Sequence, residues 1–300
     1  MFMLVGIGAP FDDQFTITSA QVSPGGDAGS PALIGRQGGL TMQGAAGAPP
    51  STIAGVLLKL SRARTHQKMV EEEIRSFLND LRAQPSPLVT EVDPETGKKQ
   101  WSIGRDLPTP PPALSPMIGD VLYNFRSALD HLVWQLVLAN GETPGRNNAF
   151  LICDDPKRFE KAAPDRLRGV AQNAVDLIKS FQPCHTQHLY FGPSLLRLEN
   201  LGNVDKHRHF NLLTAATAGG FWSRPLPLGA VDEVFIAEGP VKQGTVVASV
   251  PKQYADVGFS IVPDVAFDEA ASGVEKSVEA VLEGIEDVVD HIVDKLRVLV

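Results

Sequence analysis

The sequence predicts a mainly α-helical fold: a bundle of about five helices with a β-hairpin insertion and a small antiparallel sheet before the last helix. Three observations predict it. Residues 118–139 repeat apolar side chains at three- and four-residue spacing, which is typical of a helix packed on a core. Residues 51–83 and 274–300 show the same spacing. Residues 221–269 instead hold short β-branched runs separated by glycine and proline, which favour strands.

Taken in order, the first helix begins after the N-cap pair Ser51–Thr52 and runs to about Ala83. Residues 88–103 alternate around the turn-forming run DPETGK and predict a β-hairpin. Ser115 and Pro116 provide an N-cap and a first-turn proline for the central helix. That helix is expected to stop at Asn140–Gly141.

Three helical segments are expected before the β-rich region: a short helical turn from Pro156 to Lys161, a third helix from Asp165 to Phe181 and a fourth from Pro193 to about Ala216. The predicted organisation therefore has four parts, which are a disordered tail (1–50), a helical bundle (51–218) with the hairpin insertion at 86–105, a small antiparallel β insertion (219–270) and a C-terminal helix that completes the bundle (271–300). The tail holds ten of the 27 glycines and shows no period, so we expect either disorder or a translational start further in, near Met42.

Charge and cysteine content limit the classes of function. The net charge of −8 argues against a protein that coats nucleic acid without specificity. The acidic excess lies in residues 219–300, so the bundle itself is mildly basic and compatible with a local anionic ligand. Two cysteines, Cys153 and Cys184, make no disulfide framework and fit a reducing cytoplasm. Residues 2–10 are apolar but too short for a membrane span, so we expect a cytoplasmic protein with no membrane partner.

The central helix carries ionisable side chains beside its apolar stripe. On the far side from the stripe lie Asp120, Asn124, Ser127 and His131. Arg126 lies at the edge of the apolar stripe, and Asp130 follows one turn later, where the two can pair. Trp134 and Leu138 share the side of His131, which predicts a contact there with another helix or subunit.

The fourth helix contains a second polar cluster, which is the run Asp205, Lys206, His207, Arg208 and His209. Asp205 is expected in the middle of its apolar face, and a buried carboxylate is costly unless it is paired. Arg126 and His209 are the candidate partners. The arrangement is either an ion pair that locks two helices together or a site in which Asp205 orients a catalytic histidine or arginine.

Arg126 and His131 have an R-x4-H spacing within NFRSALDH, which resembles the signature of the HEPN superfamily (higher eukaryotes and prokaryotes nucleotide-binding domains). The resemblance implies an α-helical bundle that commonly dimerises. It also implies a metal-independent endoribonuclease of the toxin–antitoxin, antiphage-defence or RNA-processing kind, with RNA and an antitoxin as partners. The residue after the arginine is often asparagine in that family, whereas here it is Ser127. RSALDHLVWQL and NVDKHR also resemble an uncharacterised family of bacterial and phage proteins, which brings no known activity.

The residue types suit RNA cleavage without a metal or cofactor. A histidine such as His131 titrates near neutrality and can act as base or acid. An arginine such as Arg126 offers a two-pronged donor to phosphate oxygens, and Asp130 can orient either side chain. Supporting roles are assigned to Asn124, Asp205, Lys206, His207 and Arg208. Because Arg126 and His131 are about 140° apart on a helix, we expect them to converge only across a dimer or with a partner helix.

Other readings stay open. A metal site built from His131, His207, His209, Asp205 and Glu199, or from Cys184, His185 and His188, has poor ligand spacing. The basic run from Arg62 to Lys68 is expected to form intrahelical pairs, with phosphate contact as the alternative. The competing function is a non-catalytic dimerisation or interaction module in which these polar side chains are structural.

Overall fold

The computed structural model describes residues 51–185, 191–223, 235–236, 242–268 and 277–300. The described residues belong to one compact unit of the chain, Gly47–Val300. The predicted disordered tail, residues 1–50, lies outside the described residues. Within the described part the fold is mainly helical, as predicted, and none of its helices is long and apolar enough to cross a membrane.

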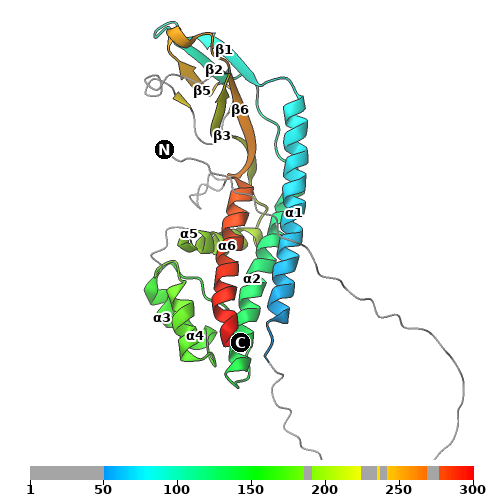
Figure 1. Ribbon diagram of the computed structural model, residues 1–300, viewed down its shortest axis with the longest axis vertical. Coiled ribbons are helices and arrows are strands. Elements are labelled where there is room, and N and C mark those ends of the chain that lie inside the picture. Colours follow the sequence, from blue (N-terminus) through cyan, green and yellow to red (C-terminus); the bar gives the residue numbers. More distant parts are fainter. Residues whose placement is uncertain (1–50, 186–190, 224–234, 237–241, 269–276) are drawn as a thin grey trace, which may run out of the picture. The chain divides into compact units, whose positions relative to one another are not determined.

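Three long helices form the centre of the fold and lie side by side (Figure 1): α1 (Ala54–Ala83), α2 (Leu114–Ala139) and α6 (Val278–Leu296). A fourth, α5 (Phe191–Asp205), packs against α6 and α2. The predicted apolar stripe of α2 is fully buried and consists of Ile118, Leu122, Phe125, Leu129, Leu132 and Leu136. It belongs to a continuous core with the apolar faces of α1, α5 and α6. Burial of these stripes supplies the main free energy of folding.

The predicted third helix, Asp165–Phe181, is wrong in its bounds. The helical turn predicted at 156–161 is present as the start of a longer helix, α3 (Pro156–Arg166), and the helix expected from Asp165 is replaced by the shorter α4 (Gln172–Ser180). Gly169 lies between them with a φ of 82°, a left-handed conformation that ends one helix and redirects the chain. The start of α3 is fixed by Asp155, whose carboxylate accepts a hydrogen bond from the Lys157 backbone N–H at 2.9 Å.

The predicted fourth helix is also too long. α5 ends at Asp205, and Leu212–Trp222 forms strand β3, which pairs antiparallel with β6 (Phe259–Phe267). Phe210 turns into the core and packs edge-on against Phe267, with ring centroids 5.6 Å apart. The run after Asp205 has apolar residues that fit either a helix or a strand, and pairing with β6 decides the outcome.

The remaining strands form a four-stranded antiparallel sheet in the order β1-β2-β5-β4. Its members are β1 (Leu88–Val92), β2 (Lys99–Ile103), β5 (Val246–Val250) and β4 (Phe235–Ile236). β1 and β2 pair with each other, and β2 pairs in turn with β5, so two insertions that are distant in sequence share one sheet. A small apolar cluster belongs to this sheet, with Trp101 and Ile103 from β2 and Val247, Ala248 and Val250 from β5. Two 3-10 turns complete the description, Lys252–Tyr254 and Arg297–Leu299.

Acidic side chains gather where α1, β6 and α6 meet. Burial raises the pKa of the Glu279 carboxyl on α6, and the negative charges of Asp264, Glu71 and Glu283 raise it further. Arg75 acts in the opposite direction. The folded chain therefore holds a proton at Glu279 to a higher pH than the unfolded chain does.

Glu279→Gln is expected to stabilise the protein at pH 7. Because the folded pKa of Glu279 lies above the unfolded value, this residue contributes stability at low pH that is lost as the pH rises through the folded pKa. We expect the variant to be more stable than the wild type at pH 7 and equally stable at pH 4, measured by urea unfolding. Glu72→Gln, at an exposed position of α1, serves as the control. A Glu279→Gln variant less stable than the wild type at pH 7 would contradict this account.

Candidate functional site

A small cleft between α2 and α5 contains four of the candidate residues that the sequence singles out, Arg126, Glu199, Asp205 and Lys206. The cavity has a volume of about 120 Å³. Its lining consists of Leu122, Tyr123, Arg126, Leu198, Glu199, Gly202, Asp205 and Lys206. Arg126 reaches it from α2, whereas Asp205 and Lys206 come from the end of α5 and the residue that follows.

Arg126 is held by three oxygen acceptors. Its Nη1 lies 3.0 Å from Glu199 Oε2, its Nη2 donates to the Phe150 carbonyl at 2.6 Å, and the same nitrogen is 3.7 Å from Asp130 Oδ1. Asp130 also accepts a hydrogen bond from the Phe150 backbone N–H at 2.9 Å. The predicted pairing of Arg126 with Asp130 is present, but the nearer carboxylate is Glu199 of α5.

These contacts involve an irregular segment, residues 150–153, whose backbone N–H and C=O groups form hydrogen bonds with side chains. Gln182, which is fully buried, donates to the Leu151 carbonyl at 2.8 Å and accepts from the Cys153 N–H at 2.9 Å. Phe150 is fully buried too, so its backbone N–H and C=O need partners within the protein. Arg126 and Asp130 supply them. Their first role in this fold is therefore to hold the 150–153 segment against α2.

Asp205 does not lie in the middle of a buried face, contrary to the sequence prediction. It is the last residue of α5 and is exposed, because the helix stops there instead of continuing to Ala216. Its carboxylate lies over Gly119 of α2, where an added Cβ would be 2.7 Å from the Asp205 Cγ. Partial burial and the charge of Asp120 raise the pKa of Asp205, and His209 opposes the shift. Glu199, and not Asp205, is the ion-pair partner of Arg126.

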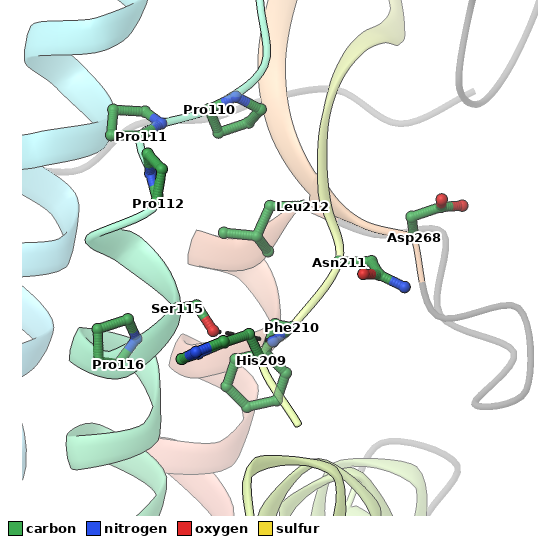
Figure 2. A pocket seen from close by; sticks show the side chains of 10 residues that line it. All are labelled: Pro110, Pro111, Pro112, Ser115, Pro116, His209, Phe210, Asn211, Leu212 and Asp268. Atoms are coloured by element: carbon green, nitrogen blue, oxygen red, sulfur yellow. Dashed lines mark hydrogen bonds between the residues drawn. The ribbon is translucent and has the colours of Figure 1, made fainter. Parts of the chain in front are cut away.

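A larger cavity of about 710 Å³ lies at the start of α2, beside the chain that leaves α5 (Figure 2). Its lining consists of Pro110, Pro111, Pro112, Ser115, Pro116, His209, Phe210, Asn211, Leu212 and Asp268. Ser115 is not the predicted N-cap, since α2 already begins at Leu114. Its hydroxyl instead accepts a hydrogen bond from the Phe210 N–H at 2.8 Å, which fixes the chain that leaves α5 against α2.

The two cavities follow one face of α2. Ser115, Gly119, Leu122 and Arg126 are spaced by three or four residues, so they lie in one row. Ser115 lines the larger cavity, Gly119 lies beneath Asp205, and Leu122 and Arg126 line the smaller one. We call this row of hollows, which the end of α5 borders, the α2–α5 groove.

A run of basic side chains borders the groove. Lys206, His207, Arg208 and His209 follow the last residue of α5, and all four are exposed. The Lys206 ammonium donates to the neutral Asn203 side chain at 3.2 Å, and within the described residues it makes no ion pair. Cations at the C-terminal end of a helix also stabilise the helix through its dipole, which is a structural reason for their position.

His131 and Asn124 lie outside the groove. The imidazole of His131 is exposed beside the start of α1, and a Cβ added to Gly55 would be 3.4 Å from its Nδ1. Asn124 is buried and donates to the Asp120 carbonyl of its own helix at 2.8 Å, so its role is structural. Arg126 faces α5 and the 150–153 segment, whereas His131 faces α1. One chain therefore does not bring the two together.

Two further predictions concern the outer faces of α2 and α1. Trp134 is 42% exposed, whereas Leu138 is buried, and contact of Trp134 with another helix or subunit stays a prediction. The basic run of α1 pairs mainly with carboxylates of other helices rather than within α1. Arg64 binds Glu286 at 2.7 Å and also Asp290, both on α6, and His66 Nδ1 lies 4.0 Å from Asp120 Oδ2 of α2.

The metal alternative gains no support from the geometry. Among the described residues, no three histidine, cysteine, aspartate or glutamate side chains come together as a metal site. His188, which belongs to the second ligand set considered, lies outside the described residues.

The sequence predicted Ser115 only as an N-cap and assigned no role in a site to Gly119, Tyr123 or the proline run 110–112. These residues lie along the groove because the chain after α5 packs against α2. For Ser115 and Gly119 the sequence signal is the helical spacing that places them in one row with Arg126.

Comparison with protein-family models, with curated protein sequences and with solved structures returns no match for this chain. Function must therefore be argued from the side chains themselves.

Arg126→Met is expected to destabilise the fold by about 1–3 kcal/mol in urea unfolding, because it leaves the Phe150 carbonyl and Glu199 without their charged donor. Methionine keeps the apolar stem of the side chain. Arg158→Met is the matched control, since Arg158 and Asp154 pair at an exposed position and the loss should stay below about 0.5 kcal/mol. Equal losses in the two variants would show that Arg126 does not hold the 150–153 segment.

Proposed function

We propose that this chain is a HEPN-like, RNA-directed protein that binds the phosphate backbone of RNA along the α2–α5 groove. The observation that carries the proposal is the exposed run Lys206–His209 at the border of the groove. Arginine, lysine and protonated histidine are the side chains that neutralise phosphates. The acidic excess of the chain lies in residues 219–300, outside the bundle that carries this run.

The available charge lies at the end of α5 rather than on α2. Arg126 is surrounded by Glu199, Asp130 and the Phe150 carbonyl, so a phosphate there would compete with two carboxylates. Lys206 faces no such competition from an ion pair within the described residues and also lines the small cleft. We therefore assign phosphate contact first to Lys206 and to His207 and His209 in their protonated forms. Arg126 shapes the groove.

Cleavage of RNA is a further step in the proposal. A metal-independent endoribonuclease needs a proton-transfer group and a cation at one phosphate. His131 and Arg126 face different neighbours within one chain, so they could serve one phosphate only if a second chain supplied the missing member. The proposed enzyme of the toxin or defence kind is thus a homodimer, and an antitoxin would act by covering the groove or the dimer contact.

Lys206→Ala is expected to weaken binding of a fluorescent single-stranded RNA by about 3–10-fold and to lower the slope of log Kd against log salt by about 0.7. Fluorescence anisotropy at several salt concentrations measures both quantities. Lys161→Ala, an exposed lysine on α3 outside the groove, is the matched control and should change neither. If wild type, Lys206→Ala and Lys161→Ala bind alike, RNA does not contact the end of α5.

Catalysis is tested with purified protein and mixed RNA in EDTA. The enzyme proposal expects cleavage that leaves cyclic phosphate ends, persists in EDTA and disappears in His131→Ala. Mixing His131→Ala with Arg126→Ala should restore part of the activity, because a mixed dimer keeps one intact pair. Activity that requires zinc or manganese would instead indicate a metal site. Absence of cleavage by the wild type would remove the catalytic part and leave the RNA-binding part standing.

The competing function, a non-catalytic helical interaction module, is favoured by a different observation. Leu58 of α1 and Tyr123 and Trp134 of α2 are large side chains with 72%, 64% and 42% exposure. Exposed apolar groups on neighbouring helices are typical of surfaces that bind another protein. In that case Arg126 and Asp130 serve only the fold, and neither RNA binding nor cleavage would be seen.

A further inference from the structure

The two cysteines of the chain lie on neighbouring backbone segments. Cys153 is the last residue of the 150–153 segment, which precedes α3, and Cys184 follows the end of α4. The Cys184 N–H donates to the Cys153 carbonyl at 3.3 Å. The side chain of Gln182 also forms hydrogen bonds with the backbone of Leu151 and Cys153. Several hydrogen bonds therefore hold the two cysteine-containing segments together.

This backbone contact suits a disulfide. A backbone N–H···O=C bond of this length holds the two Cα atoms within about 7 Å of each other, and disulfides usually span Cα separations of about 4.4–6.8 Å. Both thiols are free. The chain has two cysteines in all, so there is only one intramolecular pair to form.

We propose that Cys153 and Cys184 form a reversible disulfide on exposure to a low-molecular-weight disulfide of the glutathione class. Cys184 is partly exposed and Cys153 is buried, which sets the order of events. The Cys184 thiolate attacks one sulfur of the reagent, giving a mixed disulfide and releasing one thiolate. The Cys153 thiolate then attacks the Cys184 sulfur and displaces the second thiolate. The two protons lost by the cysteines are taken up by the two released thiolates, which become two thiols.

The environment makes this pair slow to react. Burial raises the pKa of the Cys153 thiol, and the neighbouring Cys184 raises it further, while Arg158 opposes the shift. Burial is also the main cause of the raised pKa of Cys184. Because the thiolate is the nucleophile, little of either cysteine is reactive at neutral pH. The pair therefore responds to sustained oxidation rather than to brief exposure.

The disulfide would close a loop around α3 and α4 and fasten it to the 150–153 segment. That segment is also bound by Arg126 and Asp130 through Phe150, so oxidation would stiffen the support of Arg126, which lines the small cleft. The inference does not depend on RNA binding, because the geometry of the two cysteines stands by itself.

The test treats the full chain with oxidised glutathione and then maps peptides without reduction. We expect loss of both free thiols together, a Cys153–Cys184 cross-linked peptide, recovery with dithiothreitol and a rise in Tm of about 4–10 °C on oxidation. In Cys184→Ser the other thiol should stay free and Tm should not respond to the oxidant. The peptide map of the wild type decides the case even if that variant fails to fold. Two thiols still free after prolonged treatment, a persistent glutathione adduct on Cys184 or disulfide-linked dimers would overturn the proposal.

Discussion

The hydrogen bonds that hold Phe150 against α2 are the constraint on which the rest of the structure depends. Residues 150–153 belong to no helix or strand, so their backbone groups have no regular hydrogen-bond partners. Because Phe150 is fully buried, side chains must supply partners for its backbone N–H and C=O. Asp130 accepts from its N–H and Arg126 donates to its C=O. Without these two side chains the segment would expose unpaired backbone groups to an apolar core.

Several features follow from this attachment. The 150–153 segment leads into α3, and through Gln182 it fixes the end of α4 as well. Arg126 also bonds to Glu199, so the same guanidinium sets the distance between α2 and α5 and hence the width of the small cleft. The guanidinium of Arg126 is already surrounded by two carboxylates and a carbonyl oxygen, so an anionic ligand would compete with them. We therefore place anion binding at Lys206–His209, where the basic groups lie at the surface.

The helical part of the fold was largely predictable from the sequence. Apolar spacing located α1 and α2 closely, and Gly141, with a φ of 76°, ends α2 where a glycine stop was expected. The end of α5 was not predictable, because the residues after Asp205 suit a helix as well as a strand until β6 pairs with them. That error carried over to the site, since a longer helix would have buried Asp205.

The polar contacts of the site were less predictable than the elements that carry them. Arg126 was recognised as important, but Glu199 and Phe150 as its partners depend on long-range packing that no local pattern encodes. The same applies to Gln182, which has no motif around it, and to the pairing of β2 with β5. His131 was grouped with Arg126 from spacing alone, whereas the helix directs it to α1.

Hydrogen–deuterium exchange of the full chain, with and without single-stranded RNA, tests the central claim most directly, because it reports every part of the surface at once. The account predicts that RNA slows exchange at residues 203–212 and 110–119, which border the α2–α5 groove, and that the Phe150 amide is protected in either state. Protection confined to residues 131–138 on the other side of α2, with no change at the end of α5, would contradict it.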